Sequence, residues 1–291
     1  MRSMNRSGKA AVIAALGMLP LAPAHTEETS PPPDRPTAGA TETPCAYMDP
    51  APEETLKLRA RYQEAQRLDQ PLPVPSPEEV AQFIKWQRAA LLQDFGGNCR
   101  YASANAALPQ DTRHRVVFIG DSITEGWAVQ DPAFFDSSRI DRGISGQTTP
   151  QMLVRFRQDV LDLHPETVHI LAGINDIAGN TGPTSLSRIE DNIMSMVEQA
   201  HARHIRVVVG SLLPAAVIPW RRSIGPAEQV RAINAWLKAY ARREHLTYVD
   251  YYSALSDADG GLPAKYSQDG VHPNHAAYLV MESLATRALT R

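Results

Sequence analysis

The sequence predicts an α/β fold of three layers, in which helices cover both faces of a mostly parallel five-stranded sheet, with a helical extension before it. Two observations support this. From residue 113 onward, short apolar runs alternate with segments of helical periodicity, which is the pattern of repeated βαβ units. In addition, polar and glycine-rich motifs directly follow several of the apolar runs, as expected where parallel strands end at a shared binding edge.

The expected strands are continuous apolar runs rich in β-branched residues, which is typical of strands buried on both faces. They cover residues 116–119, a short stretch around Ile140, and residues 168–171, 206–213 and 246–252. The segments with helical spacing of apolar residues cover residues 150–162, 184–203, 226–243 and 274–290. Pro226 and Pro273 stand where helices are expected to begin, because a first helical turn tolerates proline. This alternation predicts parallel strands joined by crossover helices.

Residues 1–24 have the three parts of a secretory signal peptide. The basic first part contains Arg2, Arg6 and Lys9. The second part, residues 10–21, is apolar but too short to span a membrane, and the third ends at Ala24 in the small-x-small sequence Ala-Pro-Ala. We therefore expect cleavage after about Ala24 and export to the periplasm or to the outside of the cell. The alternative is that this segment forms a buried N-terminal helix.

The remaining chain divides into three parts. Residues 25–52 are rich in proline, threonine and glutamate and poor in large apolar side chains, which predicts a disordered linker. Residues 53–112 contain two stretches of helical apolar spacing around a proline-rich break, which predicts a helical N-terminal extension. Such an extension either only packs on the main domain or also shapes its cleft. Residues 113–291 form the main domain.

The two cysteines, Cys45 and Cys99, both precede the main domain. An exported chain meets an oxidising environment, so an even count favours a disulfide between them, and two unpaired thiols are the alternative. The formal net charge is −3, and it becomes −6 once the signal peptide, with three basic residues and no acidic one, is removed. A mildly acidic chain without a basic run has no electrostatic basis for nucleic acid binding or for stable attachment to an anionic membrane.

Two short motifs at opposite ends of the main domain complete each other. The sequence Gly-Asp-Ser at 120–122 follows an apolar run and starts a helical segment, so Ser122 can lie where free N–H groups favour developing negative charge. Near the C-terminus, Asp-Gly-Val-His-Pro supplies a base, His272, and an acid three residues before it, Asp269. A serine nucleophile needs such a base and an acid that holds the base's tautomer. Alone, the serine is equally typical of a helix cap, and Asp-Gly is typical of a turn.

Two further signatures lie between these motifs, namely Gly146 in Gly-Ile-Ser-Gly-Gln-Thr-Thr and Asn175 in Gly-Ile-Asn-Asp. In this order the four motifs resemble those of the SGNH hydrolases, also called GDSL esterases and lipases, over residues 113–290. The resemblance implies a flavodoxin-like SGNH fold and an oxyanion hole formed by the N–H groups of Ser122 and Gly146 and by the Asn175 side chain. No cofactor and no metal ion are expected.

The signal peptide and the resemblance together imply an exported serine esterase that cleaves short-chain acyl esters, with O-acetyl esters, including those on carbohydrates, as the preferred class. Small-molecule or carbohydrate esters are therefore the expected partners, and the oligomeric state stays open. The alternatives are a lysophospholipase or thioesterase acting on longer acyl chains, an O-acyltransferase, and a carbohydrate-binding protein without turnover. Three side chains are candidate substrate contacts because they supply aromatic surface or positive charge: Trp127, Trp220 and Arg221. Alternatively, the tryptophans are buried, and the segment with Trp220 and Arg221 is a surface loop without contact to substrate.

Overall fold

The central element is a five-stranded sheet in a computed structural model that describes residues 44–68, 70–109 and 113–290. The predicted signal peptide and residues 25–43 of the predicted linker lie outside the described residues. The strands are β1 (Val116–Gly120), β2 (Arg139–Gly143), β3 (Thr167–Leu171), β4 (Arg206–Gly210) and β5 (Thr247–Val249). Their order is β2-β1-β3-β4-β5, and every neighbouring pair is parallel.

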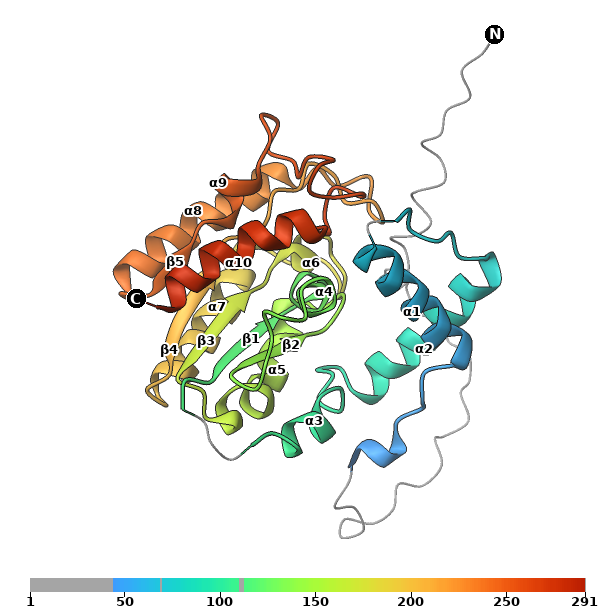
Figure 1. The fold of residues 1–291 in the computed structure, drawn as a ribbon, viewed down its shortest axis with the longest axis horizontal. Helices are drawn as coiled ribbons and strands as arrows, with labels where there is room; N and C mark the ends of the chain where they lie inside the picture. The colour runs from blue at the N-terminus through green and yellow to red at the C-terminus, as the bar shows by residue number, and fades with distance from the viewer. Residues whose placement is uncertain (1–43, 69, 110–112, 291) are drawn as a thin grey trace.

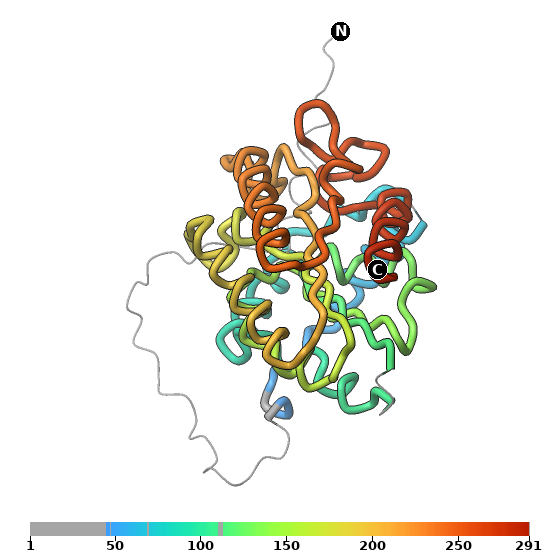
Figure 2. The backbone as a smooth tube through the Cα atoms, turned by 90° about the vertical axis from the view of Figure 1, so that its left-hand side faces the viewer, coloured from blue at the N-terminus to red at the C-terminus, as the bar shows by residue number. Residues whose placement is uncertain are grey.

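Helices cover both faces of this sheet (Figures 1 and 2). One layer contains α5 (Thr149–Asp159), α7 (Leu186–His201) and α8 (Ala227–Arg243), and the other contains α4 (Ser122–Gln130), α9 (Tyr251–Leu255) and α10 (His275–Leu289). Short helical turns, α6 (Ile174–Ile177) and η5 (Leu161–Leu163), complete the main domain. The predicted three-layer α/β/α fold is confirmed, and the sheet is parallel throughout.

Two strands are shorter than the apolar runs that predicted them. Beyond the end of β4, the N–H of Leu212 donates to the side-chain oxygen of Asn234 at 2.8 Å, instead of continuing the ladder. Beyond β5, the carboxylate of Asp250 accepts the N–H of Ser253 at 3.0 Å and thereby caps α9. Apolar periodicity does not reveal either event, because each depends on one polar side chain, Asn234 in α8 for β4 and Asp250 for β5.

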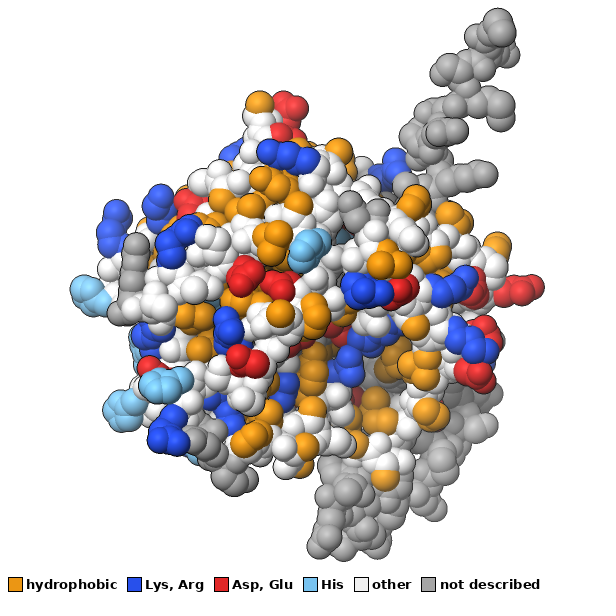
Figure 3. Space-filling view, in the orientation of Figure 1, with side chains coloured by type: hydrophobic (Ala, Val, Ile, Leu, Met, Phe, Trp, Pro, Cys, Tyr) orange, Lys and Arg blue, Asp and Glu red, His pale blue; other side chains and the backbone are white. Residues whose placement is uncertain are grey.

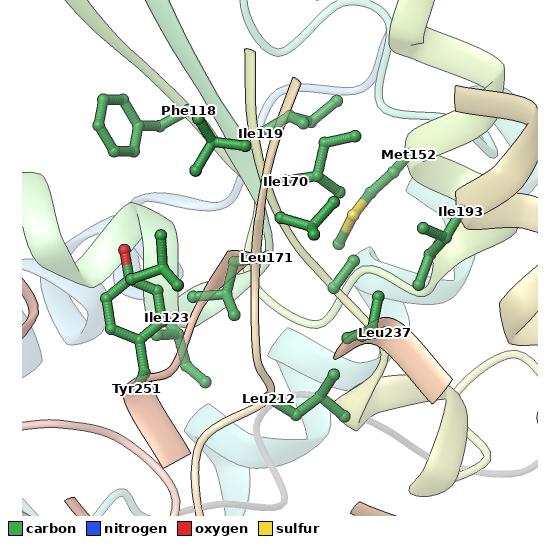
Figure 4. Close-up of a cluster of buried hydrophobic side chains, with 14 of the residues drawn as sticks. Phe118, Ile119, Ile123, Met152, Ile170, Leu171, Ile193, Leu212, Leu237 and Tyr251 are labelled. Atoms are coloured by element: carbon green, nitrogen blue, oxygen red, sulfur yellow. The ribbon is translucent and has the colours of Figure 1, made fainter. Parts of the chain in front are cut away.

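The hydrophobic core lies on both sides of β1 and β3, whose residues are buried along their whole length. Figure 4 shows Phe118 and Ile119, successive residues of β1, pointing to opposite sides of the sheet, as the period of a strand requires. Met152 of α5 and Ile193 of α7 lie on the side of Ile119, and Tyr251 of α9 lies on the other side. This packing fixes the carboxyl ends of β1 and β3, where the predicted motifs begin.

The N-terminal extension consists of η4 (Pro44–Tyr47), α1 (Glu53–Arg67), α2 (Pro77–Gln93) and α3 (Ala102–Ala106). Ser76 and Glu79 start α2 with a capping box, in which each side chain accepts the other's backbone N–H. Helix α1 packs against α2 and also against α4 of the main domain (Figure 1). Acidic and basic side chains are interleaved over α1 and α2 (Figure 3), among them the pair of Lys57 and Glu53 at 2.9 Å.

A disulfide joins Cys45 to Cys99, with 5.4 Å between the two Cα atoms. It connects η4, which lies in the part of the predicted linker that the structure describes, to the turn between α2 and α3. The carboxylate of Asp94 accepts the N–H groups of Asn98 and Cys99 at 2.9 and 2.8 Å and so shapes this turn. This turn also contacts the main domain, through Gly96 and Arg100.

Candidate active site

Ser122 is the first residue of α4, directly after the end of β1. The preceding residue, Asp121, caps the helix by accepting the N–H of Ile123 at 2.9 Å. The first N–H groups of a helix have no partner within it, so the N–H of Ser122 points out of the helix start together with the positive end of the helix dipole. The sequence strand-Asp-Ser-helix thus places the Ser122 hydroxyl at the carboxyl edge of the sheet.

His272 and Asp269 complete a hydrogen-bonded chain with this serine. The Ser122 Oγ lies 3.0 Å from His272 Nε2, and His272 Nδ1 lies 2.7 Å from Asp269 Oδ2. The other carboxylate oxygen of Asp269 accepts the N–H groups of Val271 and His272 at 2.9 and 2.8 Å. Gly270 has a φ of +83°, a left-handed conformation that glycine adopts without strain. The turn therefore fixes both the acid and the base.

The charges in this turn favour an imidazolium ion. Burial of the His272 ring disfavours the charged form, but the carboxylates of Asp269 and Asp121 outweigh this and raise the pKa of His272 above its ordinary value. Burial of Asp269 likewise works toward a higher pKa, but the charge and hydrogen bond of His272 hold the pKa of Asp269 well below its usual range. Burial raises the pKa of Asp121 to about 7. The pair is thus arranged to take up a proton from Ser122.

Gly146 lies in the loop that follows β2, and Asn175 lies in α6, the helical turn that follows β3; β2 and β3 flank β1. Gly120 of β1 is aligned with Gly143 of β2 and with Leu171 of β3, so the three loops emerge side by side. The Asn175 amide donates to the carbonyl of Gln147 at 3.0 Å, which joins the β3 loop to the residue after Gly146. The structure therefore brings Gly146 and Asn175 to the edge where Ser122 lies.

No motif in the sequence marks the residues that hold this loop in place. Asn180 donates to the Gly146 carbonyl at 3.2 Å, and Gly146 has a φ of +81°. The Gln147 side chain accepts from Arg155 Nε at 2.6 Å and donates to the Gly96 carbonyl at 2.8 Å. These partners are separated by between 8 and 51 positions along the chain, so no local spacing marks them.

Asp176 has a structural partner of its own. Its carboxylate accepts the N–H of Thr149 at 2.9 Å and the Thr149 hydroxyl at 2.6 Å, which fixes the start of α5. Burial raises the pKa of Asp176 to about 6. His275, which lies close to His272 in sequence, instead places Nδ1 3.0 Å from the Gln130 carbonyl. Neither side chain takes part in the hydrogen-bonded chain from Ser122.

The prediction that Trp127 contacts substrate is wrong, because its side chain is fully buried in the core. Its ring stacks on Phe134 with 4.9 Å between ring centroids and also packs against Phe118 and Tyr278. A large apolar ring on the buried face of α4 gains more from this aromatic cluster than from a position at the cleft. Trp127 therefore supports the helix that starts at Ser122.

Trp220, in contrast, lies beside the hydrogen-bonded chain, and Arg221 follows it in the sequence. The ring centroids of Trp220 and His272 are 5.8 Å apart, and Trp220 Nε1 donates to Asn180 at 3.4 Å. Arg221 donates to the carbonyl of Gly179 at 3.4 Å. The segment after β4 therefore borders both His272 and the loop that contains Asn180.

A small apolar cavity of about 10 Å³ lies next to the site. Its lining includes Ile123 beside Ser122, Val271 beside His272, and Leu212 and Ala215 from the segment after β4. A volume of this order holds a single water-sized group.

In the described residues, no cluster of three or more histidine, cysteine, aspartate or glutamate side chains is arranged to hold a metal ion. Helices long and apolar enough to cross a membrane are absent from the same described part of the chain.

Comparisons with known proteins identify the family of this chain. The model of the GDSL-like lipase/acylhydrolase family matches residues 118–280. The crystal structure of a proposed acylhydrolase from Bacteroides fragilis is 48% identical, with a TM-score of 0.66, over 68% of this chain and 97% of that one. A GDSL-like lipase from Bacteroides thetaiotaomicron is 44% identical, with the same TM-score of 0.66, over 67% of this chain and 98% of that one.

Among curated proteins, an uncharacterized lipoprotein of Bacillus subtilis is 26% identical over 140 residues, or 42% of this chain. The match spans 58% of that protein's length. The family match covers more than half of the chain and includes Ser122, Gly146, Asn175, Asp269 and His272. The chain thus belongs to the GDSL-like lipase/acylhydrolase family, the SGNH hydrolases, and is a carboxylic ester hydrolase.

Proposed function

We propose that this protein is an exported serine esterase that hydrolyses short-chain acyl esters, with O-acetyl groups on carbohydrates as the favoured substrates. The observation that carries the proposal is the hydrogen-bonded chain of Ser122, His272 and Asp269, with distances of 3.0 and 2.7 Å. These are the distances at which a serine hydroxyl can pass its proton to an imidazole held by a carboxylate.

In the first half of the reaction, the Ser122 Oγ attacks the ester carbonyl carbon and its proton moves to His272 Nε2. The negative charge on the former carbonyl oxygen is stabilised by the N–H groups of Ser122 and Gly146 and by the Asn175 amide. The bond between the carbonyl carbon and the alcohol oxygen then breaks. His272 gives its proton to the departing alcohol, and the acyl group remains on Ser122.

In the second half, water takes the place of the alcohol. His272 removes a proton from the water, whose oxygen attacks the acyl carbon, and the same donors stabilise the second oxyanion. The bond to Ser122 Oγ breaks, the serine recovers its proton from His272, and the carboxylic acid leaves. Asp269 stays ionised throughout, which agrees with a pKa held well below its usual range.

The size of the apolar cavity supports a short acyl group. The space of about 10 Å³, lined among others by the residues that flank Ser122 and by Val271 beside His272, is of the size of a methyl group such as that of an acetyl ester. The Trp220 ring, whose centroid lies 5.8 Å from that of His272, is a group of the kind that packs on sugar rings, and Arg221 follows it in the sequence. These features favour a small acyl group on a bulkier polar alcohol.

Export is supported by the signal-like residues 1–24 and by the disulfide between Cys45 and Cys99, because disulfides persist in oxidising compartments. The similarity to a Bacillus subtilis lipoprotein points in the same direction. Mass spectrometry of the protein secreted or released from the periplasm tests this. A mature N-terminus near residue 25 is the expected result, and an intact Met1 on the folded protein would contradict export by this signal.

Hydrolysis of p-nitrophenyl esters from acetyl to palmitoyl, with the full chain and its Ser122→Ala variant, tests the reaction. We expect the highest kcat/KM for the acetyl ester and loss of turnover in the variant. A long-chain optimum would replace the short-acyl proposal with a lipase or lysophospholipase. Equal rates in the two proteins would show that Ser122 is not the nucleophile. Release of acetate from acetylated xylo-oligosaccharides and from acetylated amino sugars then tests the carbohydrate part of the proposal.

A further inference from the structure

Glu125 is a buried acid one turn after Ser122 in α4, and both of its carboxylate oxygens have partners. Oε1 accepts hydrogen bonds from Arg59 of α1 and from Arg100, the latter at 3.1 Å. Oε2 accepts the N–H of Ser145 at 3.0 Å and also the Ser145 hydroxyl. Glu125 therefore connects two arginines of the N-terminal extension to the loop after β2.

The two arginines are what allow a carboxylate at this position. The Glu125 side chain is only 10% exposed, and a buried charge is costly unless it is paired. Burial alone would raise the pKa of Glu125, but the charges of Arg59 and Arg100 and the hydrogen bond of Ser145 together hold that pKa below its ordinary value. The arginine side chains are 40% and 42% exposed, so they retain contact with water while they neutralise the acid.

The contact at Ser145 bears directly on the proposed oxyanion hole. Ser145 precedes Gly146, and the peptide bond between them carries the N–H that is proposed to stabilise the oxyanion. On the other side of Gly146, the Gln147 side chain donates to the carbonyl of Gly96 at 2.8 Å. The glycine thus lies between two anchored residues, and each anchor leads to a residue of the chain before position 113.

We propose that Arg59 and Arg100 are positioning residues for catalysis: through Glu125 they hold the Ser145–Gly146 peptide in the orientation that stabilises the oxyanion. The N-terminal extension then completes the active site, in addition to packing on the main domain. The inference deepens the proposed esterase function and rests on it. The arginines act through Glu125, so their loss affects the transition state more than the bound substrate, since a small displacement of an oxyanion donor reduces its effect on the rate.

The extension supplies a matched pair of variants for the test. Arg59 and Arg61 lie two residues apart on α1, but Arg61 pairs with Glu79 of α2 and stays within the extension. With p-nitrophenyl acetate, we expect Arg59→Ala to lower kcat about tenfold with KM changed less than about twofold, because the donor is displaced but not removed. Arg61→Ala is expected to keep the kcat of the wild type. Arg59→Lys, which retains the charge, is expected to recover part of the lost kcat.

A double-mutant cycle with Glu125→Gln separates positioning from a general loss of stability. In the Glu125→Gln background, Arg59→Ala is expected to cause no further fall in kcat, because the acid through which it acts is already neutral. Thermal unfolding of every variant accompanies the kinetics. Should Glu125→Gln fail to fold, the comparison of Arg59→Ala, Arg59→Lys and Arg61→Ala still decides the question.

The outcomes distinguish this inference from the proposed function. An active wild type, an inactive Ser122→Ala and an unchanged kcat for Arg59→Ala would overturn the inference alone. The same holds if Arg59→Ala and Arg61→Ala lower kcat equally, or if Arg59→Ala changes only KM. A wild type without turnover on any ester would overturn the proposed function and this inference with it. A fall in kcat that is specific to Arg59 and partly restored by lysine supports both.

Discussion

The proposed acid–base half of the site and the proposed oxyanion half are held in opposite ways. Asp269 and His272 lie in one turn, and both oxygens of Asp269 accept from groups within three residues. The Gly146 loop depends on partners from distant parts of the chain, among them Glu125, Asn180 and the extension. The hydrogen bonds between Asp269 and His272 join residues three positions apart, whereas those of the Gly146 loop depend on the assembled fold.

The largest fall in activity is expected from a substitution in the turn that holds Asp269 and His272. Asp269→Asn keeps the shape of the side chain but removes the charge that holds the His272 tautomer and its raised pKa. We expect kcat for the acetyl ester to fall roughly 10³–10⁴-fold, as for loss of the charged acid in a Ser-His-Asp triad. Asp250→Asn, which alters the cap of the short helix α9 far from His272 in sequence, is the matched control.

The pH profile gives this prediction a second measurement. His272 acts as a base only when neutral, and its pKa is raised by Asp269, so kcat/KM of the wild type should fall with decreasing pH already above the ordinary histidine value of about 6.5. Without the charge of Asp269, this acidic limb should move to lower pH. An acidic limb that stays in place in Asp269→Asn would show that another group controls it.

The next largest fall in activity is expected from the loss of one of the proposed oxyanion donors. Asn175→Ala removes one proposed oxyanion donor and also the hydrogen bond to the Gln147 carbonyl. We expect kcat to fall about 10²–10³-fold with little change in KM, which is the usual cost of one such donor. Asn192→Ala, which removes a partly buried amide bonded to Thr149, should leave kcat near that of the wild type. A larger change in KM than in kcat would assign Asn175 to substrate binding.

The contrast between the two halves also explains what the sequence could predict. Continuous apolar runs indicated the strands, and the spacing of three residues between Asp269 and His272 indicated their contact, because both patterns are local. The remaining contacts of the site join residues that are far apart in the sequence and meet only in the folded chain. Glu125 reaches Arg59 across 66 positions, and nothing in its neighbourhood in the sequence marks it as the link between the extension and the Gly146 loop.

The two tryptophans show that the residue type alone does not predict whether a side chain is buried or reaches the site. Both Trp127 and Trp220 follow strands whose ends line the site, and composition treats them alike. The face of α4 on which Trp127 lies packs against α10, so the ring is buried, whereas Trp220 lies in a segment without regular structure and reaches His272. Which face of a helix is covered depends on the packing of its neighbours, and helical periodicity shows this only for long amphipathic helices.

The smallest effect on activity is expected from the disulfide, which acts on the site only through the extension. The double substitution Cys45→Ser and Cys99→Ser removes a covalent link between residues 54 positions apart. In the chain-entropy model, this loss lowers the free energy of unfolding by about 4 kcal/mol. Cys99 precedes Arg100, so we also expect a fall of about threefold or less in kcat as that side chain gains freedom near Glu125. Thermal unfolding and the pH dependence of kcat/KM measure the two effects. The acidic limb should stay in place, because the hydrogen bond between His272 and Asp269 forms within one turn. A shifted limb would show that the extension, whose Gln70 carbonyl accepts a hydrogen bond from Gln268 at 3.0 Å, also positions this turn.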